Sequence, residues 1–73
     1  MKDEQAIAES YLANVRHLLG DDPDALVAFE ALWSRGQLRA AYAAVDRVMR
    51  EQGIVLSPEQ RAADEAFYWE FVE

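Results

Sequence analysis

The chain has 73 residues, enough for one small domain and no more. Its 7 Lys and Arg stand against 14 Asp and Glu, and the net charge of −7 opposes non-specific binding to nucleic acid. The absence of cysteine excludes disulfides, thiolate metal sites and a cysteine nucleophile, and is consistent with a reducing cytoplasm. No apolar run approaches the length needed to span a membrane, and the start of the chain lacks the apolar region of a secretory leader, so we expect a cytoplasmic protein.

Residues 4–19 are predicted to form the first helix. Asp3 is placed to cap it, and Gly20 fits a left-handed stop just past its end. His17, the only histidine, falls outside the apolar arc and has no partner pattern that would make it a catalyst. The residues of the apolar arc are Ile7, Ala8, Tyr11, Leu12, Val15, Leu18 and Leu19.

The second predicted helix, residues 23–34, follows a strong start signal. Asp22 is the expected N-cap, Pro23 occupies the first helical position and Asp24 lies in the first turn. These carboxylates do not form a calcium loop, because the glycine and the twelfth-position glutamate of such a loop are absent. One face carries Ala25, Leu26, Phe29, Leu32 and Trp33, while the opposite face carries Val27 and Ala31.

Residues 37–52 give the clearest amphipathic helix of the chain. Gly36 precedes it and Gly53 follows it, so both ends are marked. We expect Val45 to lie at the centre of the core, because it is in the middle of the apolar face. That face consists of Leu38, Ala41, Tyr42, Val45, Val48 and Met49.

A local excess of positive charge accompanies this helix. Residues 35–50 hold four arginines and one aspartate, 4 − 1 = +3, whereas the rest of the chain holds three cations and thirteen carboxylates, 3 − 13 = −10. The pattern indicates either ordered charge contacts, within the fold or with a partner, or an ordinary solvated helix face. The arginine stripe consists of Arg35, Arg39, Arg47 and Arg50.

The fourth predicted helix, residues 58–72, opens with Ser57 as N-cap, Pro58 at the first position and Gln60 completing a capping box. The last turns of this helix carry large apolar side chains on all sides. A single packed face could not bury all of them. Ala63, Phe67 and Phe71 form one row along the helix, and Phe67 and Phe71 of this row are expected in the core.

Trp69 points away from this row, on the side of Ala62. We hypothesise that Ala62, Tyr68 and Trp69 form a surface that binds another protein or a second copy of the chain. The competing interpretation is that the connector at residues 54–56, or Val27 with Ala31, folds over Trp69.

The sequence offers little for catalysis. Its three glycines occur singly at predicted helix ends, so no glycine-rich loop is present to hold phosphate. One histidine without cysteine excludes the usual zinc sites, and no serine lies in a nucleophile motif. We therefore expect no enzyme activity, no cofactor and no metal.

Together these patterns predict an all-α protein, a compact four-helix bundle of short helices in a single domain over residues 1–73. The favoured function is a non-catalytic protein-interaction module, a small acidic regulator, adaptor or inhibitor of a larger assembly. Its Ala, Arg and Asp usage is typical of a bacterial or phage source. The first alternative is an acidic nucleic-acid mimic that blocks a basic groove of a nuclease or repressor. The second is helix-turn-helix DNA binding through residues 37–52, with Gly36 in the turn.

Overall fold

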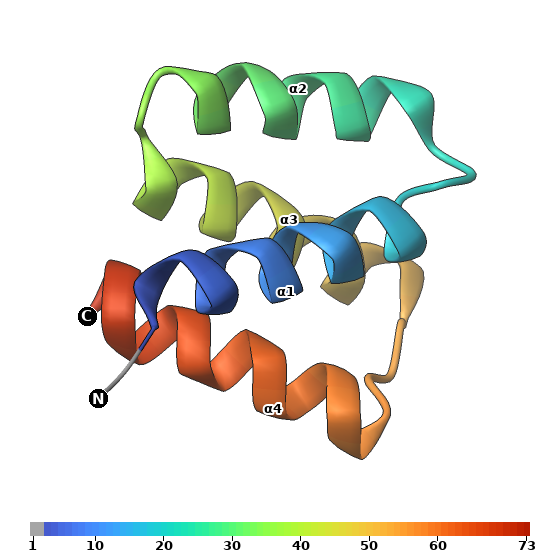
Figure 1. The fold of residues 1–73 in the computed structure, drawn as a ribbon. Coiled ribbons are helices and arrows are strands. Elements are labelled where there is room, and N and C mark those ends of the chain that lie inside the picture. Colours follow the sequence, from blue (N-terminus) through green and yellow to red (C-terminus); the bar gives the residue numbers. More distant parts are fainter. Residues whose placement is uncertain (1–2) are drawn as a thin grey trace.

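The computed structural model describes residues 3–73, which contain four α-helices and one terminal π-helical segment (Figure 1). No strand occurs within these residues, and the predicted all-α bundle is confirmed. The helices are α1 (Glu4–Leu18), α2 (Pro23–Ser34), α3 (Leu38–Gln52) and α4 (Pro58–Phe67), and the π-helix is η1 (Tyr68–Val72).

The helices pack as two antiparallel pairs. Helix α2 and helix α3 form a hairpin, while α1 lies along α4 in the opposite direction (Figure 1). The two pairs are joined by η1, which continues from α4 and packs against α3, and by ring contacts of Tyr11 on α1 with Phe29 and Trp33 on α2. This arrangement places the aromatic end of the chain beside the first turns of α3.

Local capping chemistry sets the helix starts, as predicted. The carboxylates of Asp3 and Asp22 accept backbone hydrogen bonds of 3.1 Å and 3.2 Å from Ala6 and Ala25. Helix α4 begins with the complete capping box between Ser57 and Gln60.

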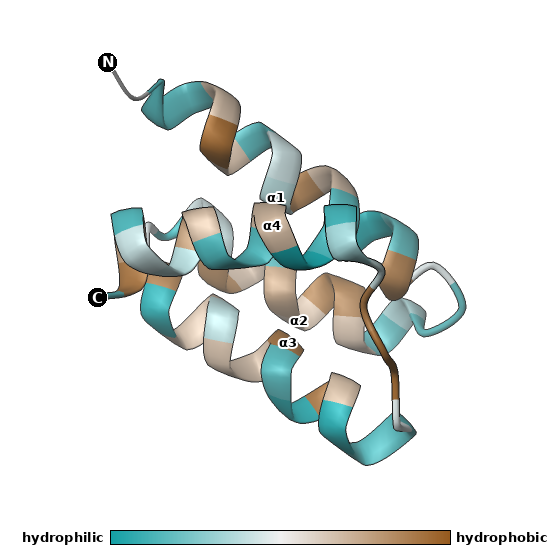
Figure 2. Cartoon of the chain, turned by 90° about the horizontal axis from the view of Figure 1, so that it is seen from below, coloured by the Kyte–Doolittle hydropathy of each residue, from teal (hydrophilic) through white to brown (hydrophobic). Residues whose placement is uncertain are grey.

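The end of α3 is set by a backbone conformation that favours glycine. Gly53 has φ +66°, and the N–H of Ile54 reaches back to the carbonyl of Met49 at 2.9 Å. This stop directs the apolar connector, residues 54–56, away from α3 and toward the start of α4, where it is drawn in brown in Figure 2.

An aromatic stack occupies the centre of the molecule. The rings of Tyr11 and Phe67 lie 4.0 Å apart and within 7° of parallel, which joins α1 to α4. Val45 is 1% exposed, which confirms its predicted central place. The buried core consists of Tyr11, Val15, Leu19, Phe29, Ala41, Val45 and Phe67.

The prediction of one continuous α-helix over residues 58–72 needs a correction. The α-helix ends at Phe67, and the N–H of Glu73 bonds the carbonyl of Tyr68 at 2.8 Å, in the i→i+5 pattern of a π-helix. The wider turn keeps the ring of Phe71 5.0 Å from that of Phe67 while Tyr68 approaches Tyr42 at 5.4 Å. Aromatic packing thus accounts for the departure from the α pattern.

Candidate interaction surfaces

Trp69 is 64% exposed, an unusual position for so large an apolar side chain. Its ring meets the edge of Tyr68 at 5.3 Å and 87°, and Tyr68 is in turn half-buried against Tyr42. Ala62 lies exposed on α4, about two helical turns before Trp69. The three predicted surface residues therefore differ in exposure. Trp69 and Ala62 face solvent, while Tyr68 is half-buried and its ring packs against the indole.

Neither of the segments named in the competing interpretation covers Trp69. Val27 is 68% exposed on α2 and Val55 is 84% exposed in the connector, so each of these valines itself faces solvent. Ala31 is exposed as well. The indole is thus open to solvent within residues 3–73.

Two exposed carboxylates lie near Trp69 along the chain. Glu65 and Glu73 are exposed and lie about one turn before and one turn after Trp69. Residues 57–73 hold five carboxylates and one cation, 1 − 5 = −4. The indole is therefore an apolar centre on a negatively charged part of the molecule.

The arginine stripe is spread along α3 and does not form a compact patch. Arg39 and Arg50 are separated by eleven positions, about 16 Å along the helix axis. Arg50 pairs with Asp46 at 3.0 Å and Arg47 with Glu51 at 3.4 Å, in exposed i,i+4 contacts that contribute little to stability. Arg35 and Arg39 are exposed and form no ion pair with a described residue.

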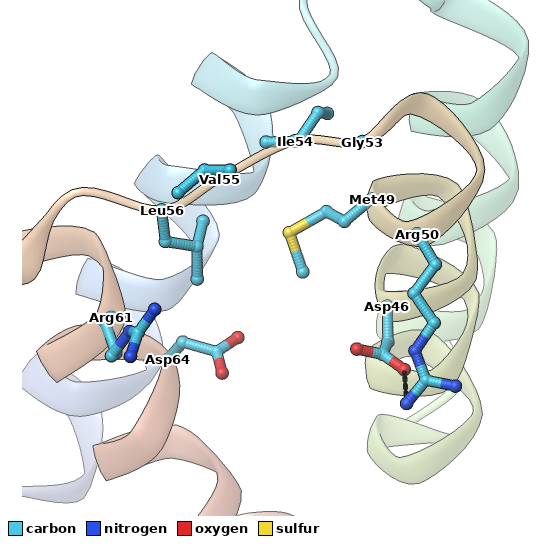
Figure 3. A pocket seen from close by; sticks show the side chains of 9 residues that line it. All are labelled: Asp46, Met49, Arg50, Gly53, Ile54, Val55, Leu56, Arg61 and Asp64. Atoms are coloured by element: carbon cyan, nitrogen blue, oxygen red, sulfur yellow. Dashed lines mark ion pairs between the residues drawn. The ribbon is translucent and has the colours of Figure 1, made fainter.

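A shallow groove of about 410 Å³ lies between α3 and α4, a feature that the sequence patterns did not reveal (Figure 3). Its apolar lining is Met49 from α3 together with Ile54, Val55 and Leu56 from the connector. Two aspartates and two arginines complete it, Asp46 and Arg50 from α3 and Arg61 and Asp64 from α4.

The two aspartates of the groove face each other across it (Figure 3). Asp64 accepts a 2.9 Å hydrogen bond from the hydroxyl of Tyr42, and no described cation lies within ion-pairing distance of its carboxylate. Burial raises the pKa of Asp64; the Tyr42 hydrogen bond lowers it, and the charges of Asp46 and Glu65 raise it further. The groove thus holds a fixed, partly desolvated carboxylate.

Two tyrosines lie behind this carboxylate. Burial is the main cause that raises the pKa of both Tyr11 and Tyr42, so both phenols stay neutral in the physiological range. The hydroxyl of Tyr11 is buried and has no hydrogen-bond partner among the described residues. An unsatisfied buried hydroxyl costs stability, which matters for a domain of this size.

Residues that could carry other chemistry are dispersed. His17 is exposed on α1, and the hydroxyl of Ser34 donates to the carbonyl of Glu30 at 2.7 Å. Within residues 3–73 no three His, Cys, Asp or Glu side chains are grouped as a metal ion would require. None of the helices in that range has the length and apolar character to cross a bilayer.

Comparisons of the chain with protein-family models, with curated proteins and with solved structures find no match.

Proposed function

We propose that the chain is a non-catalytic protein-interaction module whose contact surface is centred on Trp69. The observation that carries this proposal is the 64% exposure of an indole that the remainder of residues 3–73 leaves uncovered. Tryptophan is enriched among the residues that dominate binding energy at protein interfaces. The helical backbone and the edge contact with Tyr68 hold the ring in place, so little conformational freedom remains to be lost on binding.

The size of the chain suits such a role. It exposes 5042 Å² of surface, and an ordinary specific interface would take about 800 Å² of it, roughly one sixth. A small acidic regulator, adaptor or inhibitor of a larger assembly matches these dimensions.

A photo-crosslinking amino acid at Ala62 tests the proposal, with the same group at Val27 as the matched control. Both side chains are exposed and apolar, but Val27 lies on α2, on a different helix from Trp69. We expect one defined product from position 62, either a second copy or one partner identified by mass spectrometry, and none from position 27. Equal labelling from both positions would contradict a specific surface.

The substitution Trp69→Ala separates an interface role from a structural one. We expect the variant to keep its melting temperature at low concentration and to lose the position-62 product. A hot-spot tryptophan contributes about 2 kcal/mol or more to binding, so the loss of affinity should be at least about thirtyfold. A much lower melting temperature with undiminished association would place Trp69 in the core and end the proposal.

The nucleic-acid mimic is the second candidate, and the charge of −10 outside residues 35–50 favours it. A mimic binds a basic groove through its carboxylates, so its affinity falls steeply as salt is added. Binding centred on Trp69 should be much less sensitive to salt. A salt titration of the isolated complex therefore distinguishes the two functions.

A further inference from the structure

We propose that the groove between α3 and α4 binds a basic segment of a partner protein, with a lysine or arginine side chain placed between Asp46 and Asp64. This site lies between α3 and α4, and Trp69 is not among the residues that line it. The inference goes beyond the proposed function, because it assigns a second surface and a chemical class of partner.

The floor of the groove fits the alkyl stem of such a side chain. Met49, Ile54 and Leu56 are each only half-buried, so they retain apolar surface that an occupant can cover. Methionine adapts its shape readily, and Figure 3 shows the side chain of Met49 extending into the space between the two walls. Lysine and arginine commonly lay their methylene stems on apolar surface of this kind while the charged head stays near water.

The walls of the groove favour a positive head group. Tyr42 holds Asp64 in place, and the charge of Asp46 across the groove acts against ionisation of Asp64. A cation between the two carboxylates would relieve this repulsion and would gain a charge-assisted hydrogen bond to a group that is already oriented. An anionic occupant would instead lie beside Asp64, the groove carboxylate that has no ion-pair partner among the described residues.

The two arginines of the groove do not supply this charge. Arg50 is occupied by Asp46 in an exposed pair, with 81% of its own side chain in solvent. Arg61 is exposed and forms no ion pair with Asp64. The net charge of −7 adds a long-range attraction for basic partners and opposes the close approach of a second copy.

An NMR titration tests the site with three probes of equal chain length: hexylammonium, hexanol and hexanoate. Hexylammonium is a longer homologue of the lysine side chain. We expect it to shift the backbone amide signals of Met49, Leu56 and Asp64 in a saturable manner. Hexanol should shift them less and hexanoate least. Equal effects of all three probes, or no saturable effect of hexylammonium, would overturn the proposal.

Two matched variants test the role of the carboxylate. Asp64→Asn removes the charge but retains an acceptor for Tyr42, and Glu65→Gln makes the same charge change at the adjacent exposed position. We expect Asp64→Asn to weaken hexylammonium binding by about fivefold or more, and Glu65→Gln by less than about twofold. Equal weakening in both variants would show attraction by net charge alone, and the groove site would be wrong.

The result is independent of the Trp69 surface. Trp69→Ala should leave the hexylammonium titration unchanged even if it abolishes association. A second copy of the chain is the other possible occupant, and sedimentation tests for it. A dimer that dissociates in the Asp64→Asn variant would mean that a second copy fills the groove. That outcome would overturn the assignment of a basic partner protein.

Discussion

The hydroxyl of Tyr42 donates a 2.9 Å hydrogen bond to Oδ2 of Asp64, across twenty-two positions of sequence. This contact ties α3 to α4 at the edge of the groove and orients the carboxylate toward Asp46. It only partly offsets the cost of burying that carboxylate, because the pKa of Asp64 remains raised. The consequence can be measured as a dependence of stability on pH.

Asp64 should destabilise the fold more at neutral pH than in mild acid. Below the pKa of Asp64 in the unfolded chain, both states hold the proton and the group carries no penalty. Between that value and the raised pKa of the folded state, the folded state holds the proton more tightly, so stability falls as pH rises through this window. Above the window the ionised carboxylate imposes its full cost.

Asp64→Asn isolates this effect from the other carboxylates. We expect the free energy of unfolding of the native chain, relative to the variant, to decrease between about pH 4 and pH 7, by no more than about 1 kcal/mol because the group is half-exposed and screened. Urea unfolding at several pH values measures the difference. If the free energy of unfolding of the native chain, relative to the variant, instead increased with rising pH, the predicted direction would be wrong.

Val45→Asp should unfold the protein. Val45 is 1% exposed, and an unpaired carboxylate there would cost at least about 3 kcal/mol, while a core of this size supplies only roughly 3–5 kcal/mol of stability. The control is Val27→Asp, the same change at a valine 68% exposed on α2. Circular dichroism should show a helical, cooperatively melting Val27→Asp and an unfolded Val45→Asp.

Tyr11→Phe should leave the stability unchanged or raise it by up to about 1 kcal/mol, since it removes a buried hydroxyl that has no partner among residues 3–73. The ring stack with Phe67 remains in the variant. Thermal melting measures the change, about 4–8 °C for 1 kcal/mol in a domain near this size. A clear loss of stability would show that the hydroxyl is hydrogen-bonded in solution.

We predict no sequence-specific binding to duplex DNA near physiological salt. Helices α2 and α3 run antiparallel as a hairpin, whereas the helices of a DNA-binding helix-turn-helix cross steeply (Figure 1). Arg47 and Arg50 are engaged by carboxylates of their own helix. A mobility-shift assay with a randomised duplex library tests this prediction. Selection of a consensus that Arg39→Ala abolishes would reverse it.

The parts of the fold that depend on neighbouring residues were predictable. Asp22 and Ser57 specify helix starts through hydrogen bonds three residues away, and the period of the apolar residues identified Val45 as core. Each of these signals lies within one or two helical turns. The packing of whole helices is not needed to interpret them.

The features that were missed depend on how distant segments meet. The π-helical end of the chain results from Phe71 and Tyr68 fitting against rings on other turns and on α3, and the i→i+4 pattern of residues 58–72 contains no sign of it. The groove requires Asp46 and Asp64 to face each other, which is decided by the relative register of α3 and α4. Exposure of Trp69 likewise became evident only once α2 and the connector were placed.

The two tryptophans occupy opposite environments, which gives the protein two built-in fluorescent reporters. Trp33 is half-buried and stacks on Tyr11 at 6.1 Å and on Phe67 at 5.5 Å, whereas Trp69 stands mostly in solvent. A Trp69→Phe chain would emit from Trp33 alone, at shorter wavelength, and would follow loosening of the aromatic core. A Trp33→Phe chain would emit from Trp69 alone. Iodide would quench this emission, and binding of a partner over Trp69 would reduce the quenching.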